Sequence, residues 1–452
     1  MSRIEARPTP GLSYSPLDPH YFDESALKSE LERGFDICHG CRLCFNLCPS
    51  FPALFDAVDR YDGDVLQLTP KEIDWVVDTC FQCKVCYVKC PYTPGDDHEF
   101  QLDFPRLLQR AKAVRVRRKG MALRERLLGK PDLLGKLAGL VPFLANLGNR
   151  IGLNRLLMQW VLGVHRHKLL PDFHGETFMG WFRKHRDALN LSGGNGKVVY
   201  YPTCFVNYNE PEIGKAAMNV FAKNDLTVTC EYEQCCGMPV LDGGDVEAAQ
   251  RQARANIALL LPYVREGHTI LVNNPTCSMM MRKEYPELVD DPGAAELAAA
   301  VQDPNEYLNT LRREGRLNTD YKSTPGKVRY HVPCHLRAQN IGYKSRDMMR
   351  NISPETEVEL VAECCGHDGT WAMKTEFFEM SLDTGKKAFD GMKGPSGEEG
   401  VMATDCPLAA IQFEQATGTR PLHPLQVLDR AYREDGFATP VAPNSQQDTP
   451  DS

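Results

Sequence analysis

The sequence has no long apolar run and no excess of basic residues. No run of 18 consecutive apolar residues occurs among its 452 residues, so we expect no membrane-spanning helix. The formal net charge is −8, whereas nucleic-acid-binding domains are usually basic, so nucleic acid is not an expected partner. The first 20 residues hold no apolar signal-peptide core. We therefore expect a cytoplasmic protein, either free or peripheral on the cytoplasmic face of the cell membrane.

Nucleotide-binding glycine motifs are also missing. Neither the GxGxxG pattern nor the Walker pattern occurs, and we expect the Gly-rich segment 242–245 to form a turn rather than a phosphate loop. A chain without a flavin or nicotinamide signature leaves hydride chemistry to another protein. We therefore expect a non-flavin electron-transfer subunit of an oxidoreductase complex.

Cysteine, by contrast, is abundant and regularly spaced. The chain has 17 cysteines and no export signal, which favours metal ligation in a reducing compartment over disulfides. All but one of them fall into two patterns, and each pattern occurs twice. The first pattern is C-x2-C-x2-C-x3-C-P, found at Cys38, Cys41, Cys44 and Cys48 and again at Cys80, Cys83, Cys86 and Cys90.

The first pattern is typical of ferredoxins that hold two [4Fe–4S] clusters. Thiolates are soft, anionic donors that suit iron, and in this motif the fourth cysteine ligates the other cluster. Zinc knuckles would use only four of these eight cysteines, and a disulfide framework would need an oxidising compartment. The motif predicts one cluster on Cys38, Cys41, Cys44 and Cys90, and a second on Cys80, Cys83, Cys86 and Cys48.

The second pattern is a lone Cys, then Cys-Cys-Gly, then another lone Cys. The interval from the first Cys to the pair differs by one residue between the two copies, and the interval from the pair to the last Cys is the same. Such matched intervals indicate an internal duplication. We expect metal ligands at Cys204, Cys235, Cys236 and Cys277 in the first copy and at Cys334, Cys364, Cys365 and Cys406 in the second.

Each copy alternates short β-rich runs with helical stretches. In the first copy, apolar runs precede each cysteine position, and helices are expected near 212–223 and 246–265. This alternation predicts a small parallel sheet, in which ligands gather beyond the carboxyl ends of the strands. We therefore expect the four thiols of each copy to converge, with Gly237 and Gly366 letting the backbone turn beside them.

The fold class we expect is a multidomain chain that combines α+β and α/β parts. A small helical bis-[4Fe–4S] domain and a helical connector precede two duplicated α/β domains with small parallel sheets. We expect a disordered or extended N-terminus at 1–20, a ferredoxin-type domain at 21–108, a connector at 109–192, cysteine-rich domains at 193–325 and 326–436, and a disordered tail at 437–452.

The connector is cysteine-free and rich in basic residues and leucine. Segment 110–130 carries nine Lys or Arg and one Glu, and leucines recur at three- and four-residue spacing further along. Because apolar stripes at helical spacing are usually core, we expect helices that pack between the two lobes and present a solvated basic face. The alternative is a basic amphipathic surface for an anionic membrane or an acidic partner.

The Cys…CCG…Cys repeat resembles the CCG domain of the B subunit of heterodisulfide reductase and its relatives. The whole arrangement resembles the family of the C subunit of the anaerobic glycerol-3-phosphate dehydrogenase. The likeness spans roughly residues 30 to 430, and local stretches that carry it lie at 204–209, 165–167, 177–181, 333–335 and 404–406. The resemblance implies an iron–sulfur subunit of a membrane-associated complex that relays electrons from a partner flavoprotein towards quinone. The alternatives are a heterodisulfide reductase-like catalytic subunit, or a zinc-stabilised CCG scaffold beside a redox-active ferredoxin lobe.

The chain departs from the fullest CCG pattern in one respect. The family pattern ends in C-x2-C, whereas Met280 and Ala409 stand at the last of these positions here. Four thiolates per copy suit either a [4Fe–4S] cluster or a tetrahedral zinc ion, so one or two further clusters or zinc are expected in this half. The missing fifth cysteines weigh against the catalytic alternative. Cys230 is either a fifth ligand or, as we prefer, a buried small hydrophobe.

Two histidines adjoin the second copy of the pattern. His335 follows Cys334 directly, and His367 follows the second Cys-Cys-Gly. Each either tunes a cluster or serves protons, or is a loop histidine with satisfied hydrogen bonds.

Overall fold

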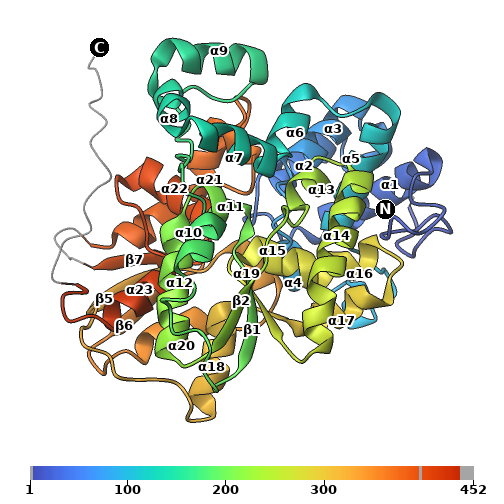
Figure 1. Ribbon diagram of the computed structural model, residues 1–452. Helices are drawn as coiled ribbons and strands as arrows, with labels where there is room; N and C mark the ends of the chain where they lie inside the picture. The colour runs from blue at the N-terminus through green and yellow to red at the C-terminus, as the bar shows by residue number, and fades with distance from the viewer. Residues whose placement is uncertain (1–3, 396–399, 438–452) are drawn as a thin grey trace.

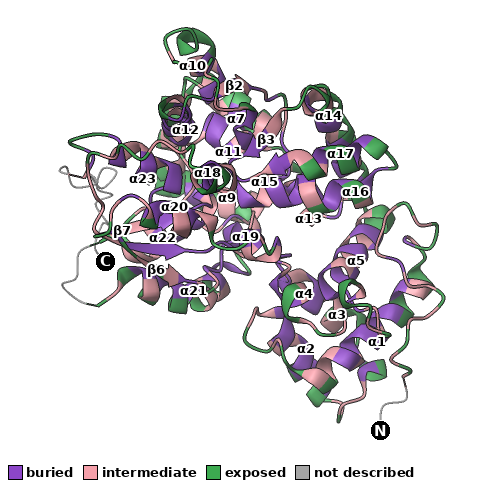
Figure 2. Cartoon of the chain, turned by 90° about the horizontal axis from the view of Figure 1, so that it is seen from below, coloured by how far each residue is buried: buried purple, intermediate pink, exposed green. Residues whose placement is uncertain are grey.

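The computed structural model describes residues 4–395 and 400–437 (Figure 1). It contains a helical N-terminal lobe, a helical connector and two α/β halves, each built on a small sheet. The helices of the N-terminal lobe gather on one side of the molecule, apart from the two sheets, in both Figure 1 and Figure 2. The tail that we expected at 437–452 lies, from residue 438 onward, outside the described residues.

The N-terminal lobe is built from short helices around an aromatic core. Four buried phenylalanine rings pack against one another there in stacked or tilted pairs: Phe35, Phe51, Phe55 and Phe104. The helices are α1 (Glu24–Cys41), α2 (Ser50–Asp59), α3 (Pro70–Thr79), α4 (Val85–Lys89) and α5 (Phe104–Lys119), with 3-10 turns η1 (Val65–Gln67) and η2 (Pro94–Asp96).

Helix α3 begins at a side-chain cap. The Thr69 side chain accepts a hydrogen bond from the backbone N–H of Glu72, and the Glu72 side chain accepts one from the backbone N–H of Thr69. This capping box satisfies two N–H groups that a helix otherwise leaves without partners. The helix ends at Thr79, so it delivers Cys80 to the loop that follows.

Residues 4–20 form no helix or strand and are tied down by buried arginines. Arg33 Nη1 donates to the carbonyl of Ala6 at 2.8 Å, and Arg110 Nη1 donates to the carbonyl of Gly11 at 3.0 Å. Both arginine side chains are fully buried. The segment therefore lies along the N-terminal lobe and caps part of its core.

The connector helices expose most of their apolar side chains. Trp160 is 84% exposed and Leu153 is 78% exposed, and α7 and α9 bury one residue each. The expectation that these leucines pack between the lobes is therefore wrong for most of the connector; only α10 packs its aromatic face into the core. The helices are α6 (Leu123–Leu128), α7 (Pro131–Leu140), α8 (Pro142–Arg150), α9 (Gly152–Leu162) and α10 (Phe178–His185).

The first α/β half holds a parallel sheet in the order β2-β1-β3-β4. Its strands are β1 (Lys197–Tyr201), β2 (Thr227–Cys230), β3 (Thr269–Val272) and β4 (Val301–Gln302). The last four residues of β1 are fully buried, as expected for a strand with helices on both faces. The helices are α11 (Thr203–Tyr208), α12 (Pro211–Lys223), α13 (Met238–Asp242), α14 (Val246–Arg265), α15 (Pro275–Met279), η3 (Met280–Glu284), α16 (Tyr285–Leu288), α17 (Pro292–Ala300) and α18 (Pro304–Arg313).

The second half repeats this arrangement with a parallel sheet in the order β6-β5-β7. In both halves the first strand is central and its two successors flank it, which is the structural counterpart of the duplicated cysteine pattern. The elements are β5 (Lys327–His331), α19 (Cys334–Ala338), α20 (Lys344–Arg350), β6 (Glu357–Val361), η4 (Trp371–Met373), α21 (Phe378–Lys393), β7 (Val401–Thr404), α22 (Pro407–Thr417) and α23 (Pro424–Ala431).

Within residues 4–395 and 400–437, every helix falls short of the length and apolarity needed to cross a bilayer.

Candidate metal centres

One cysteine group lines a hollow in the N-terminal lobe. Its walls include three cysteines of the first ferredoxin-type motif and the last cysteine of the second. Helix α1 carries the first two of them, and the last follows α4. Burial raises the pKa of the Cys38 thiol, and the charges of the other three raise it further. The group, called site 1 below, comprises Cys38, Cys41, Cys44 and Cys90.

A second group lies deeper in the same lobe. Burial raises the pKa of the Cys86 thiol, and the charges of Cys48 and Cys80 raise it further, so these sulfur atoms are near neighbours. The pKa of Cys83 is also raised, first by a hydrogen bond with Cys334, then by burial, and then by the charges of neighbouring cysteines. We call Cys48, Cys80, Cys83 and Cys86 site 2.

The cysteines of the first α/β half lie side by side, and each shifts the pKa of the next. Cys204 contacts Cys235, Cys235 contacts Cys236, and Cys236 contacts Cys277. They follow the carboxyl ends of β1, β2 and β3, which is the convergence that the strand–helix alternation predicts. We call this group site 3.

The cysteines of the second half line the other hollow. Cys334 follows β5, the pair Cys364 and Cys365 follows β6, and Cys406 follows β7. Hydrogen bonds from Cys364 and Cys83 hold the pKa of the Cys334 thiol well below its usual value. Three histidines line the same hollow: His331, His335 and His367. We call this group site 4.

The glycine after each cysteine pair has the left-handed backbone that the sequence predicts. Gly237 has φ 99° and Gly366 has φ 71°. A Cβ atom at Gly366 would lie 2.0 Å from the carbonyl oxygen of Ser381. Only glycine therefore fits this turn without moving helix α21.

The N-terminal lobe docks on both α/β halves through the loop that carries site 2. His335 Nδ1 lies 2.8 Å from Thr276 Oγ1, and His335 Nε2 lies 3.1 Å from the carbonyl oxygen of Gln82. This one imidazole therefore joins the first half, the second half and the ferredoxin-type loop. Beside it, the ammonium group of Lys84 pairs with the buried carboxylate of Glu284.

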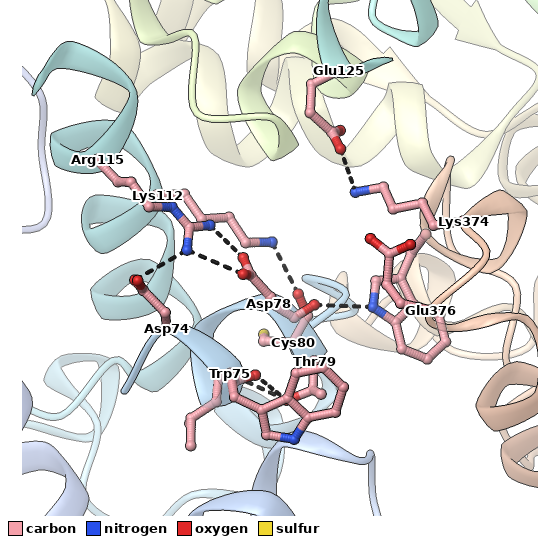
Figure 3. Close-up of polar contacts among 12 residues, drawn as sticks. Asp74, Trp75, Asp78, Thr79, Cys80, Lys112, Arg115, Glu125, Lys374 and Glu376 are labelled. Carbon is pink, nitrogen blue, oxygen red and sulfur yellow. Dashed lines mark hydrogen bonds and ion pairs between the residues drawn. The ribbon is translucent and has the colours of Figure 1, made fainter. Parts of the chain in front are cut away.

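A second set of contacts fixes the end of α3 to α5 and to the second half (Figure 3). Lys112 Nζ donates to the carbonyl of Cys80 at 3.0 Å, and Trp371 Nε1 donates to the carbonyl of Asp78 at 3.0 Å. Arg115 pairs with Asp78, so α5 and α3 are fixed to each other at the same place. Site 2 is thus held in a fixed position relative to site 4.

The four sites lie in series. Cys44 of site 1 contributes to the raised pKa of Cys48 and Cys86 in site 2, so these two groups are neighbours. Site 2 touches site 4 through the Cys83–Cys334 contact, and Cys406 of site 4 contributes to the raised pKa of Cys277 in site 3. No step in the series involves Cys230, whose Sγ packs 3.7 Å from Met218 Sδ.

The connector supplies a charged residue beside each of sites 3 and 4, and nothing in the sequence pattern indicates either residue. Asp132 of α7 accepts a hydrogen bond from the backbone N–H of Cys235 at 2.6 Å. Lys168, after α9, is buried beside Cys365 and bonds to the side-chain oxygen of Gln412. Burial lowers the pKa of Lys168 to about 7, and the charge of Cys365 opposes that shift. Site 3 therefore has a carboxylate neighbour and site 4 an amine.

The donor sets suit clusters held by thiolates. All 17 cysteines are free thiols, and each site offers four of them, each either buried or partly buried. Among the described residues, no three His, Cys, Asp or Glu side chains are placed to hold a single metal ion.

Two protein families match the chain. The Cysteine-rich domain, CCG, matches residues 198–282 and 328–413, and the Citrate utilization protein B Fer4-like domain matches residues 31–119. The chain carries one Fer4-like domain and two CCG domains. These domains indicate iron–sulfur clusters, and they contain all four sites.

Three named relatives share parts of this arrangement. The C subunit of anaerobic glycerol-3-phosphate dehydrogenase from Escherichia coli (strain K12) is 29% identical over 329 residues, which are 72% of this chain and 81% of that protein. The B subunit of fumarate reductase (CoM/CoB) from Methanothermobacter marburgensis is 26% identical over 251 residues, covering 53% of this chain and 47% of that protein. Lactate utilization protein A of Bacillus thuringiensis (strain Al Hakam) is 28% identical over 217 residues, which are 46% of this chain and 87% of that protein. No solved structure matches the chain.

Proposed function

We propose that the chain is the iron–sulfur electron-transfer subunit of a dehydrogenase complex, relaying electrons from a partner flavoprotein towards quinone. The observation that carries the proposal is the series of four cysteine sites, in which a thiol of the Fer4-like domain touches a thiol of a CCG domain. A chain of neighbouring centres is what a relay needs. Two of the relatives are, by name, subunits of a dehydrogenase and a reductase, which agrees with a partner protein here.

The proposed ligand sets follow the four sites. Sites 1 and 2 would each hold a [4Fe–4S] cluster through the crossed cysteines, and sites 3 and 4 would hold further clusters. Each cluster, when bound, supplies one-electron transfer. We propose domain limits of 21–108 for the Fer4-like domain, 109–192 for the connector, and 193–325 and 326–436 for the CCG domains.

The protein's own residues hold sites 2 and 4 close together and exclude water from the space between them. His335 and Trp371 fix the loop of site 2 against the CCG domains through backbone carbonyls. Phe81 packs against Trp371 with ring centroids 4.9 Å apart, and both rings are buried between sites 2 and 4. Apolar packing here excludes water, so charges at the two sites interact more strongly than they would in solvent.

The exposed connector supports a peripheral membrane position, which a quinone acceptor would require. Leu153, Trp160 and Phe143 are among the most exposed apolar side chains of the described protein, and all lie on α8 or α9. Exposed basic residues lie on the same run of helices, Lys136 on α7 and Arg150 at the end of α8. Apolar side chains beside basic ones are typical of helices that lie in the interface of an anionic bilayer.

Metal analysis of anaerobically purified protein tests the proposal. Four [4Fe–4S] clusters require about sixteen irons and about sixteen acid-labile sulfides per chain, with several EPR signals on reduction. About eight irons and about two zinc ions per chain would show that the CCG domains are structural zinc sites, and would contradict the relay through them.

A further inference from the structure

The two CCG domains present the same cysteines in different surroundings. Aligned on those cysteines, three positions near the metal site are tyrosine, phenylalanine and methionine in the first domain and histidine each time in the second. The aligned pairs are Tyr201 and His331, Phe205 and His335, and Met238 and His367. Duplicated sites that differ consistently in the same direction are not chemically equivalent.

All three histidines are buried in the wall of site 4. None is more than 4% exposed, and each lines the hollow together with the four cysteines. A neutral imidazole has one donor nitrogen and one acceptor nitrogen, and a buried nitrogen without a partner costs free energy. The partners of each ring therefore show which histidine is still available.

The three rings differ in how many partners they have. Both nitrogens of His335 are used, by Thr276 and Gln82. His331 Nδ1 lies 3.0 Å from Thr404 Oγ1, and its Nε2 has no partner. Neither ring nitrogen of His367 has a partner. His367 is thus a fully buried imidazole, two residues after the second cysteine of the pair, with both nitrogens free.

Nothing comparable exists at site 3. Met238 occupies the position of His367, and the four thiols lie next to one another. The carboxylate of Asp132 adjoins this site, and it accepts hydrogen bonds from the backbone N–H of Cys235 and from the hydroxyl of Tyr232. Site 3 therefore offers thiolates alone, whereas site 4 offers thiolates and a free imidazole.

We propose that site 4 is a mixed cysteine–histidine centre in which His367 gives an imidazole nitrogen to the metal group in place of one of the four thiolates of Cys334, Cys364, Cys365 and Cys406. The proposal rests on the proposed function, since it assumes metal at this site. An imidazole is a neutral donor, and replacing thiolate by imidazole raises the potential of iron–sulfur centres. Site 4 therefore has a higher reduction potential than site 3 and collects electrons from site 2.

The test uses the full chain, purified anaerobically after growth with ¹⁵N-labelled histidine. Pulsed EPR of the reduced protein is expected to show a ¹⁵N coupling from a directly bound imidazole in one of the CCG-domain signals. His367→Met, which installs the residue of the first domain, should remove that coupling. His268→Asn, at a half-buried histidine remote from the cysteines of its domain, should leave it unchanged. If His367→Met loses the centre, His367→Cys should retain the iron and still lack the coupling.

Iron and zinc are measured in the same samples, so that a failure of the mixed centre can be distinguished from a failure of the cluster relay. Four clusters with no ¹⁵N coupling, or with a coupling that survives in His367→Met, would overturn the mixed centre and leave the relay intact. Zinc at site 4 would overturn the cluster relay; X-ray absorption would then support His367 by a Zn–N distance of about 2.0 Å and reject it by four Zn–S distances of about 2.3 Å. Absence of any metal at site 4 would overturn both.

Discussion

The thiol of Cys83 lies next to the thiol of Cys334, and the two residues belong to different domains. Cys83 lies in the Fer4-like domain and Cys334 lies in the second CCG domain. The predictions below follow from this junction and from the surroundings of the sites on either side of it.

Replacing Cys83 with serine should remove one Fer4-like cluster and break the relay. Site 2 loses a thiolate, so we expect about four fewer irons per chain and the loss of one ferredoxin-type EPR signal. The CCG-domain signals should persist under chemical reduction but no longer form when electrons enter through site 1. Cys230→Ser is the matched control, because Cys230 lies outside all four sites and should retain every iron. Survival of both ferredoxin-type signals in Cys83→Ser would disprove the assignment of Cys83 as a ligand of site 2.

The two charged residues of the connector should shift the midpoint potentials of sites 3 and 4 in opposite directions. Lys168→Gln removes a cationic group next to Cys365, and because a nearby positive charge stabilises the reduced state, the midpoint potential of site 4 should fall. Asp132→Asn removes a carboxylate next to Cys235, and the midpoint potential of site 3 should rise. EPR-monitored redox titration measures both. Equal shifts of both sites in either variant would show that these charges do not act locally.

The potential of site 4 should also depend on pH through Lys168. Its pKa of about 7 means that the amine is mostly charged at pH 6 and mostly neutral at pH 8.5, so the potential should fall as pH rises between them. Cys365 and His367 are the titratable groups that face it. Titrations of wild type and Lys168→Gln at both pH values test this. A wild-type slope that the variant keeps in full would assign the pH dependence to another group.

The junction itself should depend on Trp371. Trp371→Phe loses the hydrogen bond to the carbonyl of Asp78 and should cost about 1 kcal/mol of unfolding free energy. Trp371→Ala also removes the packing against Phe81 and should cost about 3–5 kcal/mol. The rate of amide hydrogen exchange in residues 78–83 should be lowest in the wild type, higher in Trp371→Phe and highest in Trp371→Ala. Unchanged protection of that loop in Trp371→Ala would mean that the junction is held by other contacts.

Helix α9 should be required for binding to anionic bilayers. A double variant, Leu153→Glu and Trp160→Glu, adds two negative charges to the exposed apolar face and should weaken binding to vesicles that contain phosphatidylglycerol at least tenfold. Leu66→Glu is the control, because Leu66 is an exposed leucine on the N-terminal lobe, away from the connector. Equal vesicle binding by the double variant and the control would exclude this surface as the membrane contact.

Local features of the fold could be predicted because their causes are local. The capping box at Thr69, the strand before each cysteine position and the left-handed Gly366 depend on residues that are close in sequence. The leucines of α7–α9 show the limit of such reasoning. Their spacing indicates an apolar stripe, but whether a stripe faces a core or solvent depends on partners that the spacing does not describe.

The surroundings of the sites could not be predicted, because distant segments supply them. Asp132 and Lys168 reach their sites from a connector without cysteines, and His335 bridges three segments of the chain. The sequence shows that His367 adjoins a cysteine pair, but only the fold shows that its ring nitrogens have no partner.

The central claim is that the four sites hold redox centres in series, and the spin coupling between sites 2 and 4 tests it most directly. The contact between Cys83 and Cys334 places these centres close enough for their electron spins to interact. We expect the EPR spectrum of the fully reduced protein to show split or broadened signals that become simple ones in Cys406→Ser, which disrupts site 4 alone. Signals in the wild type that add as independent, uncoupled centres, or CCG domains that give no paramagnetic signal, would contradict the account.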